Sequence, residues 1–230
     1  MSKLILIETS TALCSVSLVE DGKICASRLS ETPRAQASLT AVFVDEVLRE
    51  AGIRVSDCDA VCVSSGPGSY TGLRVGVSTA KGLCFASGKP LIGVCTLDIL
   101  AAQAADNGLI PEGCKYIVPM VDARRMEVYT AVYSPDGTRL SEIEARIIDA
   151  GSFSKELEEG PVLFIGDGAE KCAGTITSPN AHFAAAFPTA DGMLRPALKA
   201  FSEGKFEDTA YFEPFYLKQF VATVSKKNLF

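Results

Sequence analysis

The sequence is short of the residues that build common metal centres. It contains one histidine, His182, and none of its eight cysteines forms a C-x-x-C pair. Because protein zinc sites need clustered Cys and His ligands, no Cys/His metal centre is expected. Most of the cysteines lie in apolar segments, such as those around Cys14 and Cys84. This placement favours buried free thiols in a reducing compartment over disulfides.

Long apolar runs and basic clusters are also absent. No apolar run reaches the roughly 20 residues that span a bilayer, and the apolar stretch in MSKLILIETS is too short for a signal peptide. We therefore expect a cytoplasmic protein without a membrane role. Lys and Arg number 22 against 28 Asp and Glu, which gives a net charge of −6. Unaided binding to nucleic acid is not expected, because that binding depends on neutralising phosphates.

The pattern of apolar residues repeats in the two halves of the chain. In the first half it predicts strands over 3–9, 14–21, 23–31, 60–65 and 90–95, with helices over 34–51, 70–86 and 96–106. In the second half it predicts strands over 116–124, 127–134, 139–148 and 161–166, helices near 152–159, from about 169 and over 190–203, and an extended segment over 203–230. The helix over 34–51 carries enough apolar residues to be buried on more than one side.

Two halves that each open with a three-stranded meander predict an α/β protein of the actin/Hsp70/sugar-kinase-like (ASKHA) fold. Each lobe would have a β-β-β-α-β-α core resembling RNase H, with an N-terminal lobe over 1–108 and a C-terminal lobe over 109–230. Enzymes of this fold hold ATP between the lobes with two hairpins whose small turns let backbone amides approach phosphates. Here the first hairpin (8–15) starts with Glu8 and lacks glycine, and the second (122–129) has arginines in its turn. The sequence thus predicts the fold without its phosphate chemistry.

The stretch SSGPGSYTGLRVG (64–76) resembles a phosphate loop but lacks the G-K-[ST] continuation of one. Gly66-Pro67-Gly68 predicts a tight turn, and Ser69 predicts a helix N-cap. Gly72 and Gly76 would then lie four residues apart inside the helix, although each costs about 1 kcal/mol against alanine. Such glycines are expected where another backbone comes close, which would be the chain's own helix over 34–51 or a partner's helix.

Several motifs together resemble the TsaB (YeaZ) family over nearly the whole chain. They are ETST with CSVSL near the N-terminus, GPGSYTGLRVGVSTAKGL (66–83), VDARRMEVY (121–129), GDGA (166–169) and PFYLK (214–218). The resemblance implies a non-catalytic scaffold or activating subunit of the bacterial complex that transfers threonylcarbamoyl to adenosine 37 of tRNAs reading ANN codons. It also implies a heterodimer with a TsaD-like paralogue, which carries the catalytic metal on a His-x-x-x-His pair, and a TsaE-like ATPase as third component.

The same resemblance implies no tightly bound cofactor, with ATP or ADP bound only at an interface of the complex. It implies contact with tRNA only through the complex, and a homodimer when the chain is alone. The helices over 34–51 and 70–86 would form the interface, and the candidate residues are Leu39, Val42, Phe43, Glu46, Tyr70, Gly72, Leu73, Arg74, Gly76, Val77 and Ala80. The chain departs from the family in Glu8, where aspartate is common, and in Gln36-Ala37-Ser38, where a histidine is common.

Some residues have two interpretations. Thr9 and Ser10, with Gly166 and Gly168, could make residual nucleotide contacts, or could form a serine-rich β-turn and a plain strand-to-helix turn. Asp122 and Arg124 would face the same side of a strand, as an ion pair or as a contact to a partner.

Two other functions compete with the scaffold. One is an ATP-dependent phosphotransferase of the same fold, which would need both phosphate hairpins. The other is a peptidase, which would need a base beside its nucleophile, and His182 lies in the loop-like stretch SPNAHFAAAFP.

Overall fold

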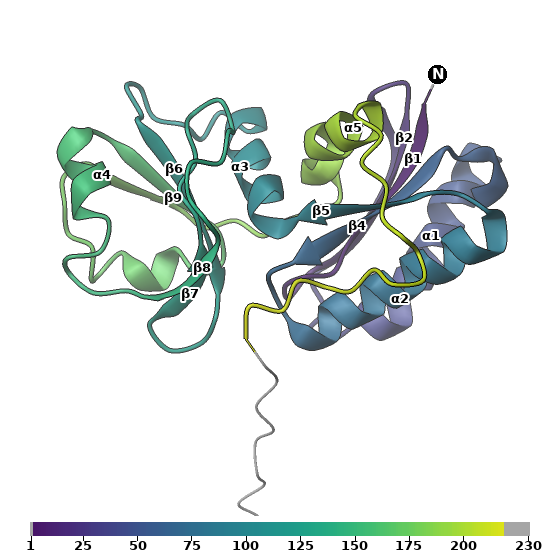
Figure 1. The fold of residues 1–230 in the computed structure, drawn as a ribbon, viewed down its shortest axis with the longest axis horizontal. Coiled ribbons are helices and arrows are strands. Elements are labelled where there is room, and N and C mark those ends of the chain that lie inside the picture. Colours follow the sequence, from purple (N-terminus) through teal and green to yellow (C-terminus); the bar gives the residue numbers. More distant parts are fainter. Residues whose placement is uncertain (1, 219–230) are drawn as a thin grey trace, which may run out of the picture.

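Residues 2–218 of the chain, in a computed structural model, form two lobes that lie side by side (Figure 1). The first lobe begins with β1 (Lys3–Glu8), β2 (Cys14–Glu20), β3 (Lys23–Ser30), α1 (Gln36–Ala51), the 3-10 turn η1 (Val55–Asp57), β4 (Ala60–Gly66), α2 (Tyr70–Ser87), β5 (Leu91–Cys95) and α3 (Thr96–Asp106). The chain continues with β6 (Tyr116–Asp122), β7 (Glu127–Thr130), β8 (Glu144–Ile147), α4 (Ser154–Glu159), β9 (Val162–Ile165), η2 (Glu170–Cys172), β10 (Ala181–Ala184), η3 (Asp191–Met193) and α5 (Leu194–Ser202).

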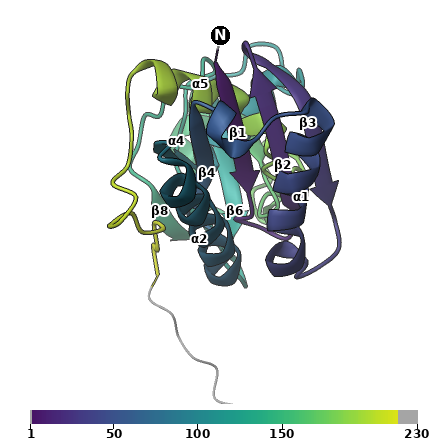
Figure 2. The same cartoon turned by 90° about the vertical axis from the view of Figure 1, so that its right-hand side faces the viewer.

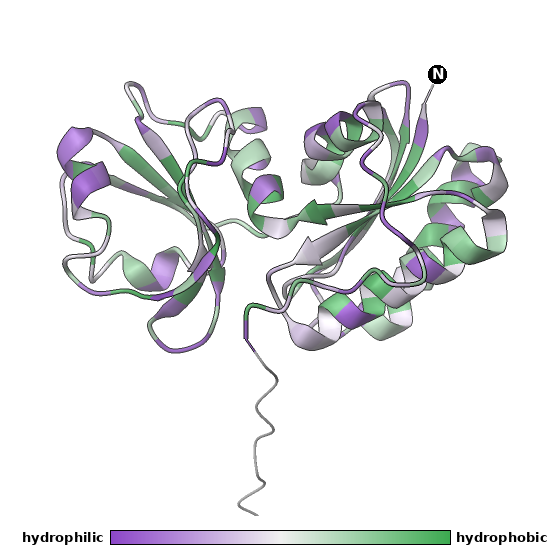
Figure 3. Cartoon of the chain, viewed as in Figure 1, coloured by the Kyte–Doolittle hydropathy of each residue, from purple (hydrophilic) through white to green (hydrophobic). Residues whose placement is uncertain are grey.

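The sheet of the first lobe has the strand order β3-β2-β1-β4-β5, with β1 antiparallel to β2 and parallel to β4. Alternate residues of β1 serve two different cores. Ile5 and Ile7 face α1 and α2, whereas Leu4 and Leu6 face α5 on the opposite side. Figure 2 shows α1 and α2 lying next to each other over one face of this sheet. Helices cover both faces of its central strands, and β1 is accordingly rich in buried hydrophobic residues, whereas the edge strand β3 is largely exposed or half-buried (Figure 3).

The second sheet repeats the order of the first. It runs β8-β7-β6-β9-β10, so each lobe places its five strands in the order third, second, first, fourth, fifth. The duplication and the ASKHA fold class predicted from the sequence are confirmed. The predicted elements of this lobe are longer than the observed ones, however. The strand over 139–148 is reduced to β8. The helix from 169 is reduced to η2, because the sequence that follows, GTITSP (174–179), is poor in helix formers and ends in proline.

One strand was missed by the sequence analysis. The segment predicted as a loop around His182 contains β10, which pairs in parallel with β9 at the edge of the sheet. Its sequence AHFA is too short and too rich in alanine to show a strand pattern.

The helix α3 lies between the lobes (Figure 1) and packs against both. Leu97 and Leu100 enter the core of the second sheet, and Ile99 enters the core behind the first sheet. The Tyr133 hydroxyl of the second lobe donates a hydrogen bond to Asp98 Oδ1 of α3 at 2.6 Å. This helix therefore has apolar residues on most of its surface because it is buried on two sides.

The C-terminal part of the chain returns to the first lobe. Met193 and Ala197 pack in the core with Leu4, so α5 belongs structurally with the N-terminal sheet, although the sequence analysis placed it in a C-terminal lobe over 109–230. Residues 207–218 then run as an extended segment along α2, here named the C-terminal strap. Lys81 Nζ of α2 donates hydrogen bonds to two strap carbonyls, at Ala210 and Phe212. The predicted extended segment over 219–230 lies outside the described residues.

The glycines in the first part of α2, and Gly68 just before it, make a close contact inside the chain. A Cβ added to Gly68 would overlap the backbone of Ser10, and one added to Gly72 would overlap the carbonyl oxygen of Thr9. A Cβ at Gly76 would overlap the Thr9 hydroxyl. The close backbone is the turn between β1 and β2, which is neither the helix over 34–51 nor a partner. This corrects the reason that the sequence analysis gave for these glycines.

We predict that Gly72→Ala destabilises the protein, although alanine is the better helix former by about 1 kcal/mol. The added methyl group must displace the Thr9 carbonyl, and overpacking of a core typically costs about 1–3 kcal/mol. The matched control is Gly82→Ala on the same helix, because a Cβ there meets nothing within 4 Å. In urea unfolding, the control should gain up to about 1 kcal/mol. Equal stability of the two variants would contradict the prediction.

Candidate functional site

In enzymes of this fold, the first hairpin offers backbone amides to phosphate. In this protein the amides of the first hairpin donate hydrogen bonds within the chain instead. The Ser10 amide donates to Glu8 Oε1 at 2.5 Å, and the Thr9 amide donates to Ser64 Oγ at 3.4 Å. Thr9 and Ser10 are both fully buried. The two residues considered as residual nucleotide contacts therefore belong to the protein's core.

Contacts from the start of α1 and from the start of α2 close this hairpin. The Ser69 amide donates to the Ser10 carbonyl at 2.6 Å, and Thr9 Oγ1 donates to the Gly72 carbonyl at 2.8 Å. Gln36 Nε2 donates to the Thr11 carbonyl at 2.9 Å. Gln36 thus bridges α1 to the hairpin. Ser69 also caps α2 as predicted, since its Oγ accepts from the Gly72 amide at 3.3 Å.

Glu8 occupies the position from which a carboxylate would orient a metal-bound water in this fold. Its side chain is fully buried, and burial raises its pKa to about 7. One oxygen accepts the Ser10 amide, while Oε2 has no hydrogen-bond partner among the described residues. A carboxyl group in this state is a component of the core, and it is not placed to hold a solvated cation.

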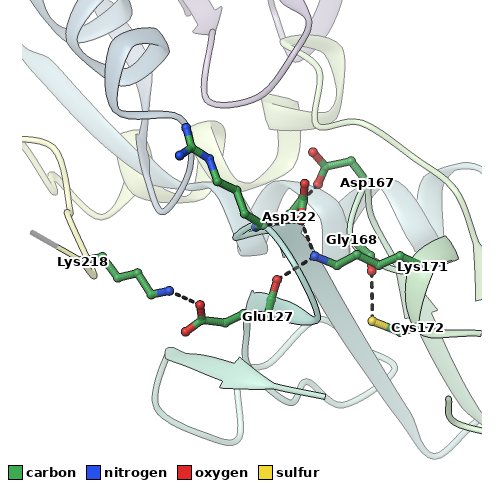
Figure 4. A network of polar contacts seen from close by, with 8 residues as sticks. Asp122, Glu127, Asp167, Gly168, Lys171, Cys172 and Lys218 are labelled. Atoms are coloured by element: carbon green, nitrogen blue, oxygen red, sulfur yellow. Dashed lines mark hydrogen bonds and ion pairs between the residues drawn. The ribbon is translucent and has the colours of Figure 1, made fainter. Parts of the chain in front are cut away.

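The second hairpin is also occupied by its own contacts. Asp122 Oδ1 accepts the Arg124 amide at 2.9 Å and forms an ion pair with Lys171 (Figure 4). The Asp122 amide donates to Asp167 Oδ1 at 3.0 Å. Burial raises the pKa of Asp167 to about 6. The ion pair considered between Asp122 and Arg124 is not formed within residues 2–218, because Asp122 pairs with Lys171 instead.

The GDGA turn at 166–169 is closed in the same way. The Gly166 amide donates to the Ala184 carbonyl at 3.1 Å, and the Gly168 amide donates to the Met120 carbonyl at 2.9 Å. A Cβ at Gly166 would overlap the Met120 backbone, so glycine is required by packing. These contacts favour the plain-turn interpretation of Gly166 and Gly168 over a contact to adenine.

The predicted interface residues of α1 and α2 divide into two groups. Six of them face the core, namely Phe43, Gly72, Leu73, Gly76, Val77 and Ala80. The other five are half-buried or exposed, namely Leu39, Val42, Glu46, Tyr70 and Arg74. Glu46 forms an ion pair with Arg28 at 2.8 Å. Only the second group can contact a partner directly, and the first group shapes the surface from below.

The structure adds a surface residue that the sequence analysis missed. Phe85 of α2 is 89 % exposed, the highest value among the large hydrophobic side chains of the described chain. It lines a shallow apolar groove of about 630 Å³ between α2 and the strap, which Gly82 and Ala210 also line. Val42 of α1 is 46 % exposed. The sequence did contain a signal for this surface. Gly82 and Phe85 are not among the buried residues of α2, and they lie on its outer face.

Other candidate chemistry is not assembled among residues 2–218. His182 is exposed on the edge strand β10. The eight cysteines are free thiols, and no group of three or more His, Cys, Asp or Glu side chains is arranged to hold a metal within this part of the chain. None of the helices described here combines the length and hydrophobicity needed to cross a bilayer.

Comparisons with known proteins agree with this architecture. Residues 30–194 match the family model described as TsaD, tRNA N6-adenosine threonylcarbamoyltransferase. The chain is 30 % identical over 231 residues to the Escherichia coli (strain K12) tRNA threonylcarbamoyladenosine biosynthesis protein TsaB, with 96 % of each chain covered. It is 30 % identical to the TsaB of Bacillus subtilis (strain 168), over 70 % of this chain and 69 % of the relative.

A solved structure supports the same relationship. YeaZ from Pseudomonas aeruginosa superposes with a TM-score of 0.81 at 29 % identity, covering 94 % of this chain and all of the other. Similarity over nearly the full length, in sequence and in fold, leads to one conclusion. The chain belongs to the TsaB family of tRNA threonylcarbamoyladenosine biosynthesis proteins.

Proposed function

We propose that the chain is a non-catalytic subunit that pairs with a TsaD-like paralogue and supports transfer of threonylcarbamoyl to tRNA. The observation that carries the proposal is the internal use of the backbone amides at both hairpins. The amides of Thr9, Ser10 and Arg124 donate to acceptors of the chain itself. An autonomous phosphotransferase of this fold would need such donors for its phosphates. The peptidase alternative lacks support as well, since His182 lies exposed at a sheet edge.

The outer face of α1 and α2 supports a role in pairing. The sequence predicts burial of α1 on more than one side, yet Ala37, Ala41 and Val42 on its second side are exposed. On α2, a Cβ added to Gly82 would meet nothing within 4 Å, and the exposed Phe85 follows about one turn later on the helix. Glycine at such a position costs stability without benefit inside this chain. A partner helix packed against this face would account for both features, and the TsaD-like paralogue, joined by a TsaE-like ATPase, is the partner that the family suggests.

We predict that the isolated chain binds Mg-ATP weakly or not at all. A charge-assisted hydrogen bond is worth roughly 1.5–3 kcal/mol, so the loss of three backbone donors lowers phosphate affinity by more than about three decades. Isothermal titration calorimetry should detect no binding in the micromolar range. The same titration on the assembled complex would show whether nucleotide binds at an interface. A micromolar dissociation constant for the chain alone would favour the phosphotransferase instead.

We predict that Glu8→Gln changes how stability depends on pH. The pKa of Glu8 is raised from 4.5 to about 7 in the folded protein, so the stability it contributes is full below about pH 4.5 and is lost as the pH rises through 7. At about pH 8 the variant should be more stable than the wild type by on the order of 3 kcal/mol. At about pH 5 the two should be nearly equal. Urea unfolding of both proteins at the two pH values makes the comparison, and a constant difference would contradict the buried, neutral acid.

The proposed function is tested by Phe85→Asp. Removing a large apolar anchor and adding a charge should weaken pairing with the TsaD-like protein about 10- to 100-fold. The matched control is Ile147→Asp on β8, because Ile147 is 72 % exposed on the other lobe. Because the subunit is proposed to be non-catalytic, an excess of the Phe85 variant should restore threonylcarbamoyl transfer by the complex. Transfer by the chain alone, or equal effects of the two variants on pairing, would overturn the proposal.

A further inference from the structure

The turn between β6 and β7 holds two consecutive arginines in a left-handed backbone conformation. Arg124 has φ 71° and Arg125 has φ 51°, a region that glycine and asparagine occupy at much lower cost. The turn is closed by hydrogen bonds from the Ala123 amide to the Glu127 carbonyl and from the Glu127 amide to the Arg124 carbonyl. Both arginines are exposed, so packing of their side chains does not account for them. A strained position that keeps a particular side chain suggests that the side chain is used.

Two carboxylates of the same hairpin are already paired with lysines. Asp122 forms an ion pair with Lys171, and Glu127 forms one with Lys218 of the strap (Figure 4). Within residues 2–218, neither arginine side chain has an ion pair or a hydrogen bond. In a chain with a net charge of −6, the turn therefore presents two adjacent guanidinium groups that are available to an anion.

Aromatic and cationic side chains lie near the end of the strap, which contacts this hairpin through Lys218. The contact between Lys218 and Glu127 brings the end of the strap to this hairpin. Two residues earlier in the strap, Tyr216 packs on Tyr70 with ring centroids 4.8 Å apart. The Arg74 guanidinium lies 4.1 Å from the centroid of the Tyr70 ring, and the Tyr216 hydroxyl nearby raises the pKa of Arg74. Guanidinium groups bind phosphates through paired donors, and tyrosine rings offer faces for bases.

We propose that the Arg124–Arg125 turn is a contact site for the phosphate backbone of RNA, and that it touches the tRNA when the chain is in its complex. The inference rests on the proposed function, which brings tRNA to the assembly. Two arginines supply only about two phosphate contacts, so the turn adds to an RNA surface shared with the partners. This small number fits an acidic chain that does not hold RNA by itself.

The test is the double variant Arg124→Asn with Arg125→Gly, in a complex assembled with the TsaD-like and TsaE-like proteins of the same genome. Asparagine and glycine suit the turn, so the melting temperature of the variant should stay equal or rise by about 2–4 °C. Affinity for a fluorescently labelled, unmodified tRNA transcript should fall about tenfold. The slope of log affinity against log salt should fall by about one for each arginine. The control is Lys23→Ala with Lys155→Ala, which removes two exposed charges from β3 and α4.

The possible outcomes separate the two proposals. If the wild-type chain does not assemble with the TsaD-like protein, the proposed function fails, and this inference fails with it. If the complex assembles and the double variant binds tRNA with unchanged affinity and salt slope, only this inference is overturned. It is also overturned if the variant loses pairing with the TsaD-like protein or binding of Mg-ATP while its tRNA affinity is retained, because the turn would then contact protein or nucleotide.

Discussion

The close packing of α2 against the turn between β1 and β2 determines the structure of the first hairpin and the position of α2 on the sheet. Gly68, Gly72 and Gly76 remove the side chains that would keep the two backbones apart. The approach lets Thr9 Oγ1 reach the Gly72 carbonyl and lets the Ser69 amide reach the Ser10 carbonyl. Each hydrogen bond contributes on the order of 1 kcal/mol, which is similar to the cost of one helix glycine. The hairpin is thereby closed, and the position of α2 on the sheet is fixed.

The packing of α2 against this turn has two consequences. The amides of Thr9 and Ser10 are hydrogen-bonded within the chain, and the outer face of α2 is left exposed. Gly72 and Gly76 of α2 face the hairpin, whereas Arg74 and Phe85 lie on the outer face of the helix. The same packing that uses the hairpin amides thus presents a helix face with an exposed apolar side chain, Phe85. The second lobe follows a similar course, with the Asp122 and Arg124 amides satisfied locally.

The sequence was sufficient for the fold because its signals there are local and repeated. The strands predicted over 3–9 and 14–21 and the predicted Ser69 cap all agree with the observed elements. It was insufficient where a signal depends on distant partners. The spacing of Gly72 and Gly76 indicated that a backbone comes close, but only the tertiary structure shows that this backbone belongs to Thr9. Likewise β10 and the return of α5 to the first sheet depend on contacts that no short stretch encodes.

The candidate site shows the same limit at the level of side chains. A list of residues on two helices cannot separate the core face from the outer face when both are apolar, and so it mixed buried Leu73 and Val77 with exposed Val42 and Arg74. The local positive charge at the second hairpin could not be predicted for a different reason. The net charge of −6 is a sum over the whole chain and does not show where charges of one sign lie together. The lysines near the second hairpin neutralise Asp122 and Glu127, which leaves Arg124 and Arg125 as local positive charge. A protein acidic overall can therefore meet an anionic partner at one turn, provided that its own carboxylates there are already paired.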